Sequence, residues 1–206
     1  MTTKQTFKIL TLNSISVEGL RRLPRERYEI ASEIGHPDAI MVRSAKMHDM
    51  TLPDSVLAVA RAGAGVNNVP VAALTKRGIP VFNAPGANAN AVKELVLAGM
   101  LLGARNLCQA WNFVEHLKEE GAALDKAVEA GKKQFVGFEL PGRTLGVVGL
   151  GAIGVQVANA ALALGMRVVG FDPQITVERA WQLSSAVEQA RSLDELFSRA
   201  DFVTVH

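Results

Sequence analysis

Short apolar runs alternate with polar stretches of helical periodicity in the first part of the chain. Apolar runs bounded by turn residues are typical of buried strands, and their alternation with helices is typical of an open parallel sheet. The predicted strands are residues 7–12, 28–31, 39–42, 57–61 and 80–82. The predicted helices are residues 16–23 and 69–77, with a short one at 53–55. The pattern predicts a small doubly wound α/β domain.

A long helical pattern follows over residues 90–106, with its apolar face predicted at Ala91, Val92, Leu95, Ala98, Gly99 and Leu102. A second helix is predicted over 110–120. Residues 120–141 are polar and interrupted by glycine, which favours a crossing segment between two domains over a core element. We therefore expect one domain over residues 1–90 and a second over 91–206.

The second part of the chain again reads as strand, helix and strand, at residues 144–148, 155–164 and 166–171. Residues 200–206 form a further apolar run, predicted as the fourth strand of this unit. A parallel strand is normally covered by a helix on each face. We therefore expect the unit to continue beyond His206, so that the chain is part of something longer.

A glycine-rich turn, Gly149-Leu150-Gly151-Ala152-Ile153-Gly154, joins the first strand of this unit to its helix. The G-x-G-x-x-G spacing assigns a separate role to each glycine. Gly149 permits the tight turn, Gly151 lets the backbone approach a pyrophosphate, and Gly154 lets helix and strand pack closely. The helix N-terminus also favours an anion. A dinucleotide site is predicted, the alternative being an ordinary turn between strand and helix.

Asp172 ends the next strand, close to the roughly 20 residues after the last glycine at which a ribose-binding carboxylate is expected. A carboxylate there accepts hydrogen bonds from ribose hydroxyls and repels a 2′-phosphate. No Lys or Arg follows before Arg179. The sequence therefore favours NAD over NADP as the cofactor.

Composition narrows the class of protein further. The chain has 206 residues, 49% of them hydrophobic, and a formal charge of +2, which does not favour a nucleic-acid or membrane partner. No apolar run approaches the roughly 20 residues of a membrane span. Cys108 has no partner for a disulfide and is predicted as a packed core thiol, which favours a reducing, cytoplasmic location. No metal site is indicated.

Seven segments, in this order, resemble the N-terminal part of the D-2-hydroxyacid dehydrogenases. They are 41–44 (MVRS), 61–69 (RAGAGVNNV), 77–85 (RGIPVFNAP), 137–140 (GFEL), 149–154 (GLGAIG), 171–173 (FDP) and 200–206 (ADFVTVH). The resemblance is strongest to the branch that oxidises D-3-phosphoglycerate in serine biosynthesis. It implies two doubly wound domains, a flavodoxin-like substrate domain and a Rossmann NAD domain that is incomplete here, in a homodimer or homotetramer.

The resemblance also implies roles for individual residues. Backbone N–H groups of Ala64 and Gly65 would bind the substrate carboxylate. Residues Arg43, Ser44 and Asn88 would contact a small phosphorylated hydroxy acid, and Lys132 would reach the substrate of a neighbouring subunit. The cofactor would contact Gly149, Gly151, Ala152, Ile153, Gly154, Asp172 and His206.

Simpler roles stay open for three of these side chains. Arg43 could instead be a solvated arginine at the end of a strand. Asn88 could instead be a helix N-cap, a position that Asn favours. Lys132 and Lys133 could instead be an exposed basic pair. The chain also departs from many relatives at Ala152, where they carry Arg or His, and at Asn67, where they often carry Asp.

The family's catalytic Arg, Glu and His correspond to sequence after His206, so no catalytic residue is assigned within these residues. Limited to them, the chain is expected to be inactive. The leading hypothesis is an NAD-dependent oxidoreductase of D-2-hydroxy acids. The alternatives are a hydroxypyruvate or glyoxylate reductase and a non-enzymatic, NAD-sensing protein of the corepressor type.

Overall fold

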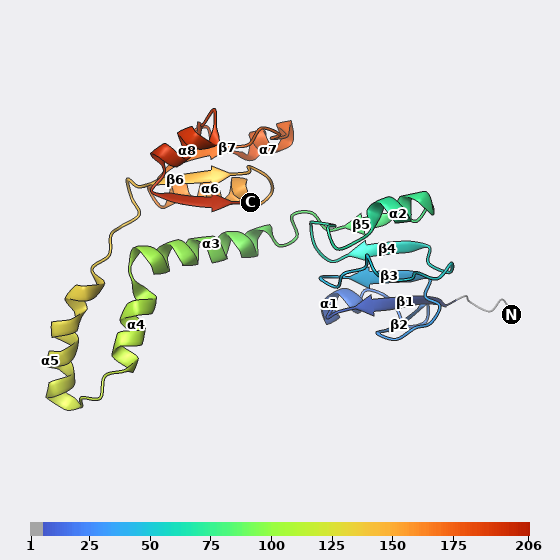
Figure 1. Ribbon diagram of the computed structural model, residues 1–206, viewed down its shortest axis with the longest axis horizontal. Coiled ribbons are helices and arrows are strands. Elements are labelled where there is room, and N and C mark those ends of the chain that lie inside the picture. The colour runs from blue at the N-terminus through green and yellow to red at the C-terminus, as the bar shows by residue number, and fades with distance from the viewer. Residues whose placement is uncertain (1–5) are drawn as a thin grey trace. The chain divides into compact units, whose positions relative to one another are not determined.

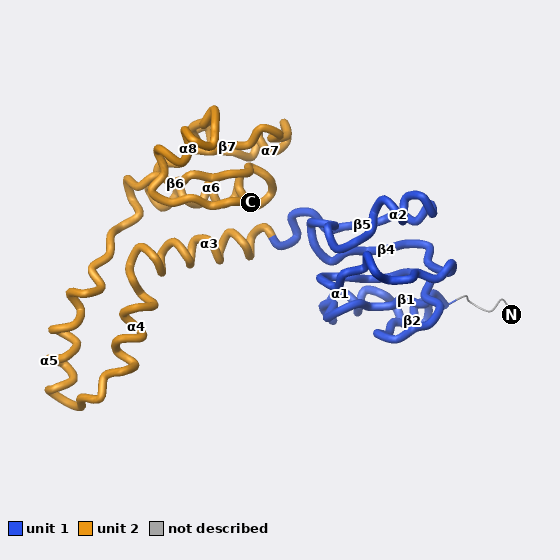
Figure 2. Tube along the Cα trace, in the orientation of Figure 1, with its two compact units in different colours: residues 1–88 blue, residues 89–206 orange. Residues whose placement is uncertain are grey.

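The computed structural model describes residues 6–206, which form two compact units: unit 1 ends at residue 88, and unit 2 is residues 89–206 (Figure 2). Each unit contains one sheet in which every pair of neighbouring strands is parallel. The α/β class predicted from the pattern is therefore confirmed. The boundary between family domains, expected near residue 90, stays a prediction.

The five strands of unit 1 lie in the order β2-β1-β3-β4-β5 (Figure 1). They are β1 (Phe7–Leu12), β2 (Tyr28–Ala31), β3 (Ala39–Val42), β4 (Ala58–Arg61) and β5 (Val81–Asn83). The helices are α1 (Val17–Leu20) and α2 (Val71–Lys76). Ile40, Val42, Met47, Val59 and Leu74 are fully buried between sheet and covering segments. The core of unit 1 thus combines β-branched residues of β3 and β4 with apolar side chains from segments that cover the sheet.

Unit 2 has the strand order β8-β7-β6-β9. Its strands are β6 (Thr144–Val148), β7 (Arg167–Phe171), β8 (Glu188–Gln189) and β9 (Phe202–Val205), and the helices beside them are α6 (Gly154–Ala163), α7 (Val177–Gln182) and α8 (Leu193–Arg199). β9 is the fourth strand of this sheet, as predicted. The pattern missed β8, α7 and α8, which are short and largely exposed.

Helix α3 (Ala89–Ala104) contacts the core of unit 2 through a different face from the one predicted. Val96, Met100 and Ala104 pack into the cluster that includes α6, whereas Leu95 is 73% exposed. Spacing of four residues brings the first three onto one line of the helix. Apolar residues surround most of α3, so its periodicity did not identify the buried side.

Residues 120–141 were predicted as a crossing segment between two domains rather than a core element. Most of them are exposed, as expected outside a core, but they lie within unit 2 and are largely helical. They include α5 (Gly121–Gly131) and the 3₁₀ helix η1 (Lys132–Phe135), which join α4 (Leu107–Glu115) in a helical arm, residues 107–135 (Figure 1). The Phe113 and Phe135 rings lie 5.3 Å apart, and Phe113 also packs against Gly131, where a Cβ would collide with the ring. This aromatic contact stabilises the arm.

Two further predictions are corrected. Cys108 is exposed at the start of α4 instead of packed in a core, because α4 buries none of its residues. Residues 53–55 form a turn, since three residues starting at Pro53 are too few to continue as a helix. Among the described residues, none of the helices has the length and apolarity to cross a bilayer.

Candidate functional sites

Gly149 follows β6 directly and has a φ of 88°, a conformation that favours glycine. Its N–H donates to the Phe171 carbonyl at 2.8 Å, which holds the turn against the end of β7. A Cβ at this position would collide with the carbonyl oxygen of His206 after β9. Gly149 therefore serves both the turn and the close approach of the neighbouring chain segment.

Gly154 and Gly151 differ in their surroundings. A Cβ on Gly154 would collide with the Gly149 carbonyl oxygen and lie 3.3 Å from Val147 Cγ1. A Cβ on Gly151 would have no atom within 4 Å. Gly154 is thus required by packing inside the protein, whereas Gly151 leaves open space beside the loop that a ligand can enter.

The loop also presents free backbone donors. Within residues 6–206, the N–H groups of Gly151, Ala152 and Ile153 donate to no protein acceptor, and no side chain caps α6. These groups precede a helix of 10 residues, whose dipole adds a partial positive charge. Free donors, positive potential and open space together fit a pyrophosphate.

The Asp172 carboxylate lies at the end of β7 and binds the loop. Its Oδ2 accepts from the Leu150 N–H at 2.8 Å, and its Oδ1 accepts from the Gln174 N–H at 2.8 Å. Arg179, the first basic residue after Asp172 in the sequence, donates from its guanidinium to Gln182 Oε1 at 2.8 Å. A recess of about 220 Å³ adjoins Asp172, and its apolar walls are Leu150, Ile175, Leu183 and Val187. The acid is thus held beside an apolar recess.

His206 follows β9, next to the end of β6, where Val148 pairs with Val205. Its N–H donates to the Val148 carbonyl at 2.9 Å, and its Nε2 lies 2.9 Å from Thr204 Oγ1. Burial lowers the pKa of the imidazole, so the neutral ring is favoured. The predicted cofactor residues, those of the glycine loop, Asp172 and His206, therefore meet at the carboxyl ends of β6, β7 and β9.

In unit 1, the predicted substrate residues also meet at the carboxyl ends of adjacent strands. Arg43 and Ser44 follow β3, and the loop with Ala64 and Gly65 follows β4. Both side chains, Arg43 and Ser44, are exposed. Because ligands of doubly wound sheets bind at this edge, the arrangement agrees with a small-molecule site.

The loop after β4 is held by its carbonyl groups and leaves its amides free. Asn83 Nδ2 donates to the Ala64 carbonyl at 2.6 Å, and the Ala84 N–H donates to the Gly63 carbonyl at 2.9 Å. Among the described residues, no acceptor binds the N–H groups of Ala64 or Gly65. Consecutive free amides on a fixed loop are suited to a carboxylate.

Two predicted residues lie elsewhere. Asn88 is exposed immediately before α3. Lys132 belongs to the helical arm of unit 2, where its Nζ pairs with Glu129 at 2.5 Å, both side chains being more than half exposed. The structure thus leaves the binding roles of these two residues as predictions.

Sequence reasoning missed three residues that hold the substrate loops, Asn13, Arg61 and Asn68. Asn13 directly follows a predicted strand, Arg61 is the last residue of one, and Asn68 precedes the predicted helix 69–77. Each hydrogen-bonds the backbone of residues 43–45. A polar residue directly after an apolar run was the available signal for Asn13 and Arg61. Their targets lie 18 or more residues away in sequence, so the pairing itself was not readable.

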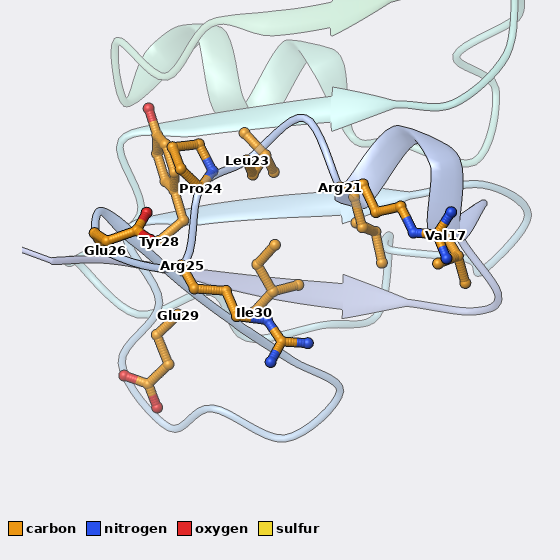
Figure 3. A pocket seen from close by; sticks show the side chains of 10 residues that line it. Val17, Arg21, Leu23, Pro24, Arg25, Glu26, Tyr28, Glu29 and Ile30 are labelled. Atoms are coloured by element: carbon orange, nitrogen blue, oxygen red, sulfur yellow. The ribbon is translucent and has the colours of Figure 1, made fainter.

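A cavity of about 840 Å³ lies beside α1 and β2 in unit 1 (Figure 3). Its walls are mainly apolar, with Val17, Leu23, Pro24 and Ile30 among them. Arg21, at its margin, pairs with Glu18 at 2.6 Å. The predicted substrate and cofactor residues are not among those that line this cavity.

The chain belongs to the D-isomer specific 2-hydroxyacid dehydrogenase family. The family model for the NAD binding domain matches residues 97–206, more than half of the chain. The matched segment contains the glycine loop and Asp172. The cofactor of this domain is therefore NAD, as the sequence predicted.

Curated relatives named D-3-phosphoglycerate dehydrogenase match most of the chain. The one from Methanocaldococcus jannaschii is 40% identical over 181 residues, which cover 86% of this chain and 32% of the relative. The one from Archaeoglobus fulgidus is 35% identical over 209 residues, covering 98% and 36%. The chain thus spans about a third of the length of these relatives.

Solved structures agree with the fold. The NAD⁺-bound 3-phosphoglycerate dehydrogenase of Entamoeba histolytica has a TM-score of 0.67 and 25% identity, over 98% of this chain and 62% of that one. The apo D-mandelate dehydrogenase of Rhodotorula graminis has a TM-score of 0.73 at 24% identity, over 98% and 65%. The second similarity shows the fold alone.

Proposed function

We propose that this chain provides the NAD site and part of the substrate site of an oxidoreductase that oxidises D-3-phosphoglycerate. The observation that carries the proposal is the glycine loop, in which Gly151 leaves open space beside three free amides. NAD, when bound, accepts the hydride from the hydroxyl-bearing carbon. The residues described here bind and orient the reactants.

On the cofactor side, the amides of Gly151, Ala152 and Ile153 hold the pyrophosphate. Asp172 accepts from the ribose hydroxyls while its present bonds to Leu150 and Gln174 keep the carboxylate in place. The apolar recess beside it has walls suited to an adenine ring. His206 lies at the same sheet edge and contributes a neutral imidazole wall to the pocket.

On the substrate side, Ala64 and Gly65 donate to the carboxylate through the backbone. Arg43 and Ser44 are exposed at the same edge of unit 1 and bind the phosphate, for which a guanidinium is well suited. Asn88 is a further polar contact. The names of the relatives support a phosphorylated hydroxy acid as substrate.

The proposed enzyme is a homo-oligomer. Helix α4 presents Leu107, Trp111 and Val114 on one line, 47%, 66% and 51% exposed. Such a stripe is costly in water and is typical of an interface. A second copy that covers the helical arm would bury it, and Lys132 on the same arm would then reach the partner's substrate.

The cofactor half of the proposal is tested by titrating the chain with NADH and following NADH fluorescence. Saturable binding, with weaker binding of NADPH, is expected. A chain that binds neither nucleotide contradicts the assignment.

The substrate half is tested with a matched pair of ligands, D-3-phosphoglycerate and D-glycerate, which differ only in the phosphate. NMR titration of the chain should show shifts at Ser44 and Gly65, with D-3-phosphoglycerate binding at least about tenfold more tightly. The Arg43→Gln variant should lose that difference. Equal affinity for D-glycerate in the wild type would exclude a phosphorylated substrate and favour a reductase of the hydroxypyruvate type.

A further inference from the structure

Several backbone groups of the segment Arg43-Ser44-Ala45 are hydrogen-bonded by side chains from the ends of β1 and β4 and from the loop after β4. Asn13 Oδ1 accepts from the Ser44 N–H at 3.2 Å and from the Ala45 N–H. Asn68 Nδ2 donates to the Ala45 carbonyl at 2.8 Å and to the Arg43 carbonyl at 3.3 Å. Arg61 Nε donates to the Arg43 carbonyl at 3.0 Å. These three side chains form a clamp around the segment.

Asn13 is the member of the clamp with an unusual backbone. It follows β1 and has a φ of 69°, in the left-handed region that a non-glycine residue enters at a cost. Asn tolerates that region better than most residues, because its short side chain bonds locally. In this conformation Asn13 Oδ1 accepts from two successive N–H groups, those of Ser44 and Ala45, which lie 31 and 32 residues further along the chain.

We propose that Asn13 is a positioning residue that presets Arg43 and Ser44 for an anionic substrate. This inference rests on the proposed function. The clamp uses backbone groups of residues 43–45 and leaves the exposed side chains of Arg43 and Ser44 available. A loop ordered before binding avoids the entropy cost of ordering it around the ligand, so affinity rises without a new contact.

Arg61 and Asn68 are the other two members of the clamp. Gly63 leaves the space in which the Arg61 guanidinium lies, since a Cβ there would collide with it. The backbone of Asn68 is held in turn, because its main-chain carbonyl accepts from the Met47 N–H at 2.8 Å. The segment is thus bonded from the ends of β1 and β4 and from the loop after β4, which limits its motion in more than one direction.

The test compares two changes at Asn13. Asn13→Gly removes the acceptor but tolerates the positive φ, and Asn13→Asp keeps an acceptor oxygen. Asn106→Gly is the matched control, because Asn106 also has a positive φ, 51°, but lies in unit 2. Amide exchange with water is measured by NMR at Ser44 and Ala45, with the buried Val59 amide, bonded to Pro80, as the reference. D-3-phosphoglycerate affinity is measured in parallel.

The expected result is about tenfold faster exchange at Ser44 and Ala45 in Asn13→Gly, and about tenfold weaker D-3-phosphoglycerate binding. Exchange at Val59 and NADH affinity should stay unchanged. Asn13→Asp should restore slow exchange, and Asn106→Gly should change neither quantity. A general loss of structure would also speed exchange at Val59, so it is distinguished from the local effect.

Two results overturn the inference: unchanged exchange in Asn13→Gly, or faster exchange with undiminished affinity. If the wild type does not bind D-3-phosphoglycerate, the proposed substrate is wrong. The exchange comparison then decides by itself whether Asn13 orders the segment. Failure of the clamp and failure of the proposed function are therefore separate outcomes.

Discussion

Replacing Gly151 by Val should weaken NADH binding roughly 100-fold and leave the ligand-free protein as stable as before. A Cβ at Gly151 meets no atom within 4 Å, so the added side chain enters open space. Surface changes of this kind alter the free energy of unfolding by about 0.5 kcal/mol or less, so the thermal midpoint should move by about 2 °C at most. The same side chain occupies the space in which a pyrophosphate would reach the free amides.

The expected loss of affinity follows from the donors involved. A hydrogen bond to a charged group contributes about 1.5 kcal/mol or more. Losing two of the three bonds from Gly151, Ala152 and Ile153 therefore costs about 3 kcal/mol, or roughly 100-fold in the dissociation constant for NADH. Fluorescence titration measures this change directly.

Gly154→Val is the informative contrast, because a Cβ there collides with the Gly149 carbonyl. Forcing the side chain in should cost about 2 kcal/mol or more and lower the thermal midpoint by roughly 5 °C or more. Gly35→Val is the control, since a Cβ at Gly35 also meets no atom within 4 Å but lies in unit 1. The reasoning is refuted if Gly151→Val binds NADH normally, or if it unfolds as readily as Gly154→Val.

Three further outcomes are expected. Asp172→Ala combined with Gln174→Arg should shift preference from NADH to NADPH by at least about tenfold in parallel titrations, because a repelling carboxylate is exchanged for a cation; a wild type that already binds both equally contradicts this. The hydrogen bond from the Thr144 N–H lowers the pKa of Asp201, and Arg143 and Arg167 act in the same direction. The charged carboxylate therefore stabilises the fold at pH values above its unfolded-state pKa. This stabilisation is lost as the pH falls through the lower folded-state pKa. Asp201→Asn should therefore lower the urea midpoint at about pH 7, and the difference from the wild type should vanish near about pH 2; an equal difference at both pH values refutes the assignment. Trp111→Glu should convert the oligomer to monomers, measured by light scattering, because it places a charge in the apolar stripe of α4; a wild type that is already monomeric contradicts the proposed interface.

The sequence by itself determined most of what is local in this protein. Strands β1, β2 and β3 have the predicted bounds, because short, mainly apolar runs between turn residues indicate a strand without reference to the rest of the chain. The distinct surroundings of Gly149, Gly151 and Gly154 also agree with their spacing, since the turn, the approach and the packing all arise within one strand–turn–helix unit. The position of Asp172 at the end of the next strand was likewise predicted from the sequence pattern.

The features that only the tertiary structure decided depend on contacts between segments distant in sequence. The side of α3 that is buried depends on α6, and apolar residues around most of the helix left several faces equally suitable. The helical arm depends on contacts such as that between Phe113 and Phe135, which neither of its helices reveals alone. Asn13 bonds Ser44 and Ala45 only because parallel pairing of β1 with β3 brings their carboxyl ends together. Periodicity reports which positions are apolar, but a chain's own pattern does not state which other segment will cover them or complete their hydrogen bonds.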